Sequence, residues 1–206
     1  NLGGIYQDLG NLDQALASTL KSLELEPDNP DAYMNLGGIY QDLGNFDQAL
    51  AATLQSLELN PDNPTALMNL GSIYKDLGDY HQARSSTLKA LDINPDNHGA
   101  LVNLAAIYFE NDDYEKAVLT LQKSLSIKKT ATAMLFLSET YCKMGRNEES
   151  LEFALGAVAQ DKNREDCLLN LARTYQLCNH GEKAIETIMT AIKMNDRSEK
   201  AYLAAS

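Results

Sequence analysis

An asparagine recurs along the chain at a nearly constant spacing, and its amide is well suited to binding chemistry. A carboxamide can donate and accept hydrogen bonds at the same time. It can therefore bind a main-chain peptide group of a ligand whatever side chain the ligand residue carries. Asparagine is also a mediocre helix former, so its persistence where the surrounding sequence has diverged favours a binding role. The alternative interpretation is that the amides bond to a neighbouring helix, or that duplication merely copied them. The row consists of Asn1, Asn35, Asn69, Asn103 and Asn170, and Phe136 interrupts it.

Two phenylalanines next to this row are candidates for holding an apolar group. Phe109 and Phe136, with Cys142, are expected to line a more apolar patch in the C-terminal half. We predict that this patch anchors a bulky side chain of a bound segment. The alternative is that both rings fill the packing between residues 98–130 and 131–164, whose junction is irregular.

Acidic residues form a second row, expected at the ends of the same helices. A carboxylate there opposes the helix dipole at a cost of about 0.3–1 kcal/mol, so these side chains are candidate contacts for a basic partner. A solvated edge is the alternative. The net charge of −12, most of it carried by residues 1–97, argues against nucleic acid and membrane as partners. The row consists of Asp8, Asp42, Asp76 and Glu110.

Residues that could support catalysis or bind a metal are scattered. The three histidines lie in different repeats, and the sequence contains no HExxH, GxSxG or GxxxxGK[ST] motif. No two cysteines have the CxxC spacing of a zinc site. We therefore expect no catalysis, no cofactor and no metal, and the cysteines are interpreted as free thiols in a reducing, cytoplasmic compartment. These residues are His81, His98 and His180, and Cys142, Cys167 and Cys178.

The elements that must position these residues are copies of one sequence unit. Residues 35–63 recur almost unchanged at 1–29, and the same skeleton returns at 64–97. A tyrosine marks each copy at intervals of 33 or 34 residues, which is the signature of a stacked-repeat architecture. The tyrosines are Tyr6, Tyr40, Tyr74, Tyr108, Tyr141 and Tyr175. The predicted repeats are 1–29 (truncated), 30–63, 64–97, 98–130, 131–164 and 165–198, and residues 199–206 begin a further helix.

Each repeat is predicted to form two helices and no strand. In residues 30–63, Asn29 is a plausible N-cap and Pro30 a plausible first helical residue. Gly44 is expected to end the first helix, and Asn45 to cap the second. A glycine inside a helix costs about 1 kcal/mol relative to alanine, so its recurrence at Gly37 suggests that a larger side chain does not fit between the helices.

This pattern resembles the tetratricopeptide repeat family over essentially the whole chain. The 34-residue period, Leu36-Gly37, Tyr40, Ala49 and the closing prolines carry the resemblance, and the near-identical early copies look like bacterial arrays. It implies an all-α, right-handed solenoid of stacked antiparallel helix hairpins. It also implies that the asparagine row faces a concave groove, where it resembles the peptide-backbone ladder of the O-linked N-acetylglucosamine transferase repeats.

The predicted function is a non-catalytic scaffold that binds an extended protein or peptide segment in this groove. The chain starts in the middle of a repeat, so we expect it to be a piece of a longer protein. One alternative is therefore the substrate-recruiting arm of a larger, transferase-like enzyme. Another is self-assembly, because the predicted solenoid is uncapped and its ends could stack on one another.

Overall fold

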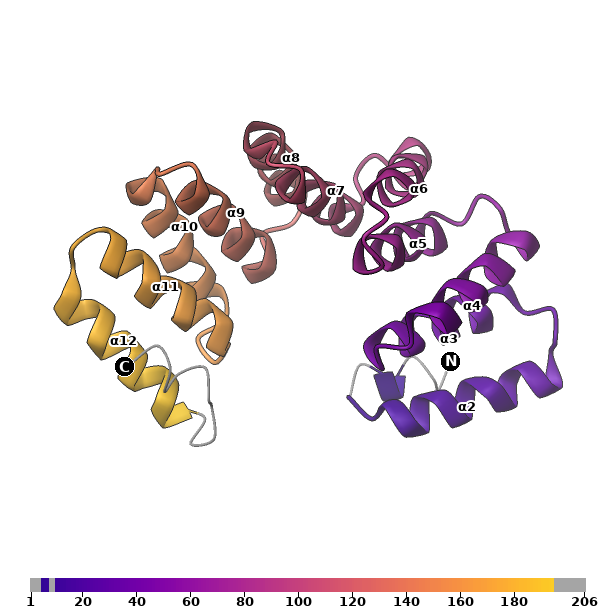
Figure 1. Ribbon diagram of the computed structural model, residues 1–206. Helices are drawn as coiled ribbons and strands as arrows, with labels where there is room; N and C mark the ends of the chain where they lie inside the picture. The colour runs from indigo at the N-terminus through magenta and orange to yellow at the C-terminus, as the bar shows by residue number, and fades with distance from the viewer. Residues whose placement is uncertain (1–4, 8–9, 195–206) are drawn as a thin grey trace. The chain divides into compact units, whose positions relative to one another are not determined.

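The computed structural model describes residues 5–7 and 10–194, and its ribbon is drawn in Figure 1. Within these residues the chain forms helices and no strand, as the sequence predicts. Asn1, Asp8 and the predicted helix start at 199–206 lie outside the described residues. The helices are α2 (Leu12–Leu25), α3 (Pro30–Asp42), α4 (Phe46–Leu59), α5 (Pro64–Asp76), α6 (Tyr80–Ile93), α7 (His98–Glu110), α8 (Tyr114–Ile127), α9 (Ala131–Lys143), α10 (Asn147–Gln160), α11 (Glu165–Leu177) and α12 (Gly181–Met194).

The chain divides into two compact units, each of which is described by itself. The first unit comprises residues 1–107, with α2 to α6 and most of α7, and the second comprises residues 108–206. Within each unit, consecutive helices pair as antiparallel hairpins such as α3 with α4 and α11 with α12 (Figure 1). None of the described helices combines the length and the apolar character that a membrane span requires.

The start of the helix pair α3–α4 is set by capping residues. α3 begins at Pro30, and the side chain of Asn29 accepts a hydrogen bond from the Ala32 backbone N–H, which confirms the predicted N-cap. After α3, Gly44 takes a positive φ of 74° that favours glycine. Asn45 then precedes α4 as predicted, but its side chain makes no capping hydrogen bond.

A residue with left-handed backbone conformation follows the first helix of a repeat, and its type differs along the chain. Gly10, Gly44, Gly78 and Gly145 have positive φ there, whereas Asp112 (58°) and Asn179 (60°) replace glycine in two repeats. Aspartate and asparagine tolerate this conformation better than other non-glycine residues. The turn geometry is thus kept where the glycine of the sequence pattern is lost.

Small residues bring the two helices of a hairpin into close contact. A Cβ atom built on Gly37 would overlap the side-chain oxygen of Thr53 on the partner helix, and Gly71 stands in the same relation to Thr87. Ala49 is fully buried, in the position where the sequence predicts a small residue on the second helix. The expectation that a larger side chain does not fit at Gly37 is therefore confirmed.

Two asparagines at helix starts provide a matched test of capping. The Asn63 side chain accepts hydrogen bonds from the backbone N–H groups of Thr65 (3.0 Å) and Ala66 (3.2 Å), whereas Asn45 makes no such bond. We expect Asn63→Ala to lower the free energy of unfolding by about 1 kcal/mol and Asn45→Ala to change it by less than about 0.5 kcal/mol. Chemical denaturation followed by circular dichroism measures both, and equal losses would contradict the assignment.

Candidate functional site

The amides of Asn35 and Asn69 occupy equivalent turns of α3 and α5 in the first unit. Both residues are half-buried. Neither amide forms a hydrogen bond with another residue in the part of the chain that the structure describes. Each therefore keeps a donor and an acceptor that no described residue uses. A pair of such groups, one repeat apart, can bind two separate main-chain groups of an extended ligand.

The other two described asparagines of the row are placed differently. The Asn103 amide nitrogen lies 3.4 Å from the main-chain oxygen of Met68, a long hydrogen bond within the first unit. Asn170, in the second unit, is only 6% exposed. Its side-chain oxygen accepts a 2.8 Å hydrogen bond from the Ser138 hydroxyl, while its amide nitrogen has no partner among the described residues. The prediction that Asn170 binds a ligand thus requires its amide to become accessible.

Asn170 belongs to a buried polar cluster between α9, α10 and α11. The Ser150 hydroxyl donates to the main-chain oxygen of Ser138 (2.8 Å), and the two hydroxyls lie 2.9 Å apart. The Thr174 hydroxyl donates to the main-chain oxygen of Asn170 (2.8 Å). In the first hairpins, glycine and alanine occupy the positions of Ser138 and Ser150. Hydroxyls that replace hydrogen or methyl in a closed space must bond to one another, which is why a network forms here.

The described members of the predicted acidic row, Asp42, Asp76 and Glu110, are the last residues of α3, α5 and α7, and the two aspartates bridge neighbouring repeats. The Gln7 amide donates to the Asp42 carboxylate at 2.7 Å, and the Gln41 amide donates to Asp76 at 2.6 Å. The ammonium group of Lys75 also lies 2.7 Å from Asp76. Glu110 is exposed at the end of α7. This role of the glutamines was not predicted from the sequence, although both directly follow a repeat tyrosine.

The structure brings Phe109 and Phe136 together in the second unit. Their ring centroids lie 5.2 Å apart at an interplanar angle of 49°, and Phe109 also meets the edge of Tyr114 at 5.4 Å. Both phenylalanines are half-buried. The cluster therefore has a packing partner in α8 and still presents part of its aromatic surface.

A glutamate that the sequence analysis did not single out lies on α9. Burial raises the pKa of the Glu139 carboxyl above its ordinary value, the nearby Arg173 lowers it, and Asp166 raises it. Glu139 aligns with Gly38 and Ser72 of the earlier repeats, so the change from small to charged at this register position was the available signal. This register position is uncharged in the first unit, where Gly38 and Ser72 occupy it, and carries a partly buried carboxyl group in the second unit, where Glu139 occupies it.

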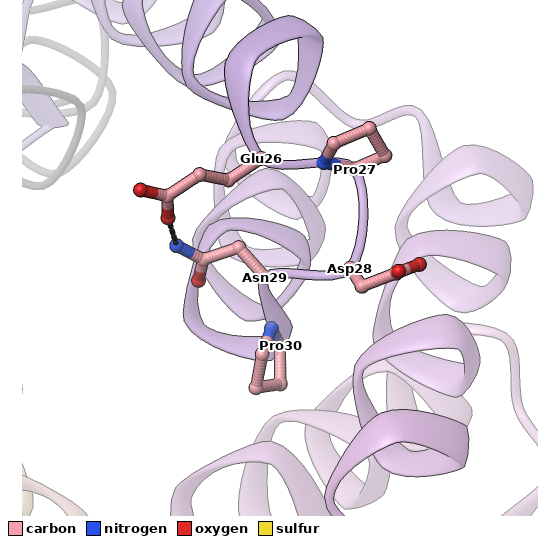
Figure 2. Close-up of a pocket in the computed structure, with 5 residues that line it drawn as sticks. All are labelled: Glu26, Pro27, Asp28, Asn29 and Pro30. Atoms are coloured by element: carbon pink, nitrogen blue, oxygen red, sulfur yellow. Dashed lines mark hydrogen bonds between the residues drawn. The ribbon is translucent and has the colours of Figure 1, made fainter.

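The hollow in Figure 2 is formed by the connection between α2 and α3. It measures about 440 Å³ and is lined by Glu26, Pro27, Asp28, Asn29 and Pro30. The Asn29 amide nitrogen donates to the Glu26 carboxylate at 2.8 Å, and Figure 2 shows these two side chains directed toward each other while Asp28 points away. Because Asn29 also caps α3, its polar groups stabilise the turn, and the hollow offers no cluster of free groups for chemistry.

A second hollow of about 540 Å³ lies among α4, α5 and α6 of the first unit. Leu67 and Leu70 contribute to its apolar lining, and Lys89 and Asp92 lie at its polar part. Leu67 stands where the preceding repeat has the larger Tyr33.

Titratable residues do not gather into a metal site in the described residues. No group of three or more histidine, cysteine, aspartate or glutamate side chains there could hold a metal ion. His180 packs its ring against the edge of Tyr175, with centroids 6.0 Å apart. The described side chains thus provide hydrogen-bonding and apolar surfaces.

Comparison with known families identifies the repeat. The model described as the cytochrome c-type biogenesis protein H TPR domain matches residues 6–134, and a tetratricopeptide repeat model matches residues 165–198. A search of curated proteins found no match. The first of these models covers more than half of the chain.

Several solved structures share the fold. PilW, a widely conserved type IV pilus biogenesis factor, is 21% identical and has a TM-score of 0.85, covering 100% of this chain and 96% of its own. A thermophilic TPR protein from Thermus thermophilus is 25% identical with a TM-score of 0.79, over 85% and 96%. YrrB, described as a TPR protein with an unusual peptide-binding site, is 22% identical with a TM-score of 0.61, over 90% and 96%. The predicted all-α solenoid of stacked helix hairpins is therefore confirmed.

Proposed function

The chain belongs to the tetratricopeptide repeat family, and on this premise we propose that it is an interaction scaffold whose first helices bind an extended peptide segment. The observation that carries this proposal is the pair of half-buried amides of Asn35 and Asn69, which no described residue satisfies. A half-buried amide without a partner has an unsatisfied donor and an unsatisfied acceptor, and a ligand can form hydrogen bonds with both. The main chain of an extended segment offers donors and acceptors at regular intervals.

The acidic row favours a segment that carries basic side chains. Asp42 and Asp76 are held in place by hydrogen bonds from Gln7 and Gln41. Each carboxylate has two oxygens and several lone pairs, so it can accept a further bond from lysine or arginine. Residues 1–97 carry fourteen acids and four cations, and this excess steers a cationic ligand toward the first unit.

In the second unit, the proposal assigns the exposed part of the Phe109–Phe136 pair to an apolar side chain of a ligand. Aromatic rings bury large apolar areas and commonly act as anchors at interfaces. YrrB, which is described as having an unusual peptide-binding site, supports a peptide ligand by likeness of fold. The proposal includes the predicted cytoplasmic location, which fractionation of the source cells would check.

The decisive experiment measures peptide affinity after removal of the two amides. Peptides selected from a random library by the unaltered chain are titrated, by fluorescence polarisation, against the Asn35→Ala/Asn69→Ala variant. Two to three lost hydrogen bonds of about 1 kcal/mol each predict an affinity loss of roughly 30- to 150-fold. The matched control is Asn45→Ala, since that exposed side chain makes no capping bond.

The outcomes separate the parts of the proposal. Unchanged affinity in the double variant, with the helical circular dichroism signal intact, would refute the amide pair as the binding element. A Phe109→Ala/Phe136→Ala variant tests the anchor separately, and it should lose affinity only for peptides with a bulky apolar residue. Peptides selected without enrichment in lysine or arginine would contradict the role of the acidic row.

A further inference from the structure

Two of the three cysteines contact the same turn of the second unit. The Cys142 sulfur, on α9, lies 2.9 Å from the Ser150 hydroxyl of α10 and 3.8 Å from the Thr174 hydroxyl of α11. The Cys178 sulfur donates to the main-chain oxygen of Asn147 at 3.4 Å. Asn147 and Ser150 are both in the first turn of α10, so the two thiols approach that turn together.

The helical register of α11 places Cys178 on the same face as a residue that contacts Cys142. Thr174, which contacts Cys142, lies four residues before Cys178, and residues four apart share one face of a helix. Cys178 is the C-cap of α11, so its backbone is at a helix end and has more freedom than an interior position. Burial raises the pKa of the Cys178 thiol, and Cys142 and Glu148 raise it further.

The third cysteine differs in the properties that govern thiol chemistry. Cys167 is fully buried, and burial, with Asp166 nearby, raises its pKa to about 11. Cys142 and Cys178 are both partly exposed. Because the thiolate is the nucleophile, an inaccessible thiol with a high pKa should not react with a reagent in solution. Cys167 therefore serves as an internal control.

We propose that Cys142 and Cys178 form a modification site for small disulfide oxidants such as oxidised glutathione, which join the two thiols in an intramolecular disulfide between α9 and the end of α11. One cysteine thiolate attacks the oxidant, breaks its S–S bond, forms a mixed disulfide and releases one small thiol. The second cysteine thiolate attacks the protein sulfur of that mixed disulfide and releases the second small thiol. Two cysteines are oxidised, one oxidant disulfide is reduced, and the two protons go to the released thiols.

The bond would connect consecutive repeats of the second unit. It would close a loop that contains all of α10 and α11, which restricts the unfolded chain and opposes separation of α9 from α11. The site is distinct from the proposed peptide contacts at Asn35 and Asn69, which lie in the first unit. Oxidation would thus stiffen one unit without occupying the amides of the other.

The test treats the full chain with oxidised glutathione under native conditions, followed by alkylation in denaturant and mass spectrometry of a proteolytic digest. We expect one peptide pair linked through Cys142 and Cys178, with Cys167 recovered as the alkylated thiol. Cys167→Ser should retain the link, and Cys142→Ser and Cys178→Ser should each lose it. The linking rate should rise with pH, because the thiolate fraction rises.

Each contrary outcome overturns the proposal. Stable mixed disulfides on Cys142 and Cys178 without a link would show that the sulfurs cannot meet. A link that involves Cys167, a link only between two chains, or no reaction at all would do the same. The two serine variants are checked for the helical circular dichroism signal of the unaltered chain, and the result for Cys167→Ser keeps the test valid if one of them fails to fold.

Discussion

Replacing Gly37 with valine is expected to destabilise the first unit by about 3 kcal/mol or more. A Cβ atom at this position would overlap the Thr53 hydroxyl and lie 3.3 Å from the main-chain oxygen of Ala49, so it meets both side chain and backbone of the partner helix. The two helices would have to separate, and buried contacts such as those of Ile39, which is fully buried, would loosen. The midpoint of urea unfolding, followed by circular dichroism, measures the loss.

The adjacent glycine provides the matched control for this prediction. A Cβ atom on Gly38 would meet only the end of the flexible Gln7 side chain, at 3.1 Å. Gly38→Ala should therefore be neutral or gain up to about 1 kcal/mol from helix propensity. Adding Thr53→Ala to Gly37→Val should recover part of the loss, because the closest overlap disappears, and a strictly additive double variant would contradict the proposed contact.

The close helix contact shows how far the sequence could predict packing. Alanine has a higher intrinsic helix propensity than glycine, so a glycine at position 37 indicates that space is limited there. The sequence does not show which residue of the partner helix imposes that limit. The sequence did not single out Thr53, whose hydroxyl the structure places against the space that a side chain on Gly37 would need. A contact between residues on two helices depends on how the helices cross, and a one-dimensional pattern does not contain that angle.

Helix ends were more predictable than side-chain partners. Asn29 and Pro30 act through the adjacent backbone, so local sequence was enough to predict the start of α3. The bond from Gln41 to Asp76 joins side chains that are 35 residues apart. Glutamine is long and flexible, so its partner depends on the rotamer and on the neighbouring repeat. The candidate site therefore could be located by register, but its internal hydrogen bonds could not.

The asparagine row is the clearest case in which one residue type at one register position meets two environments. Asn35 is half-buried with an amide that no described residue binds, whereas Asn170 is 6% exposed and accepts a hydrogen bond from Ser138. The difference follows from residues on other helices, since Ser138 and Ser150 replace smaller residues around Asn170. Recurrence alone therefore did not separate an amide available to a ligand from one engaged by the fold.

Replacing Asn170 with the nearly isosteric aspartate is expected to lower the free energy of unfolding by about 3–5 kcal/mol at pH 7, because it buries a carboxylate in place of a neutral amide. Burial raises the pKa of such a carboxyl in the folded state above its value in the unfolded chain. Below the unfolded pKa of about 3.9 both states are protonated, and the variant should approach the unaltered chain in stability. As pH rises, the unfolded chain ionises first, so the loss grows and levels off above the folded pKa. Urea unfolding between acid and neutral pH follows this change.

Asn35→Asp is the control that connects this prediction to function. The Asn35 side chain is half-buried and has no hydrogen-bond partner among the described residues, so water can reach a carboxylate there. Its stability should fall by less than about 1 kcal/mol, with little dependence on pH. Its affinity for a selected peptide should fall, because the carboxylate no longer donates a hydrogen bond to a main-chain oxygen. Equal stability losses for the two variants would contradict the assignment of different environments. A large loss of stability in Asn35→Asp would indicate that Asn35 stabilises the fold and does not serve as a peptide contact.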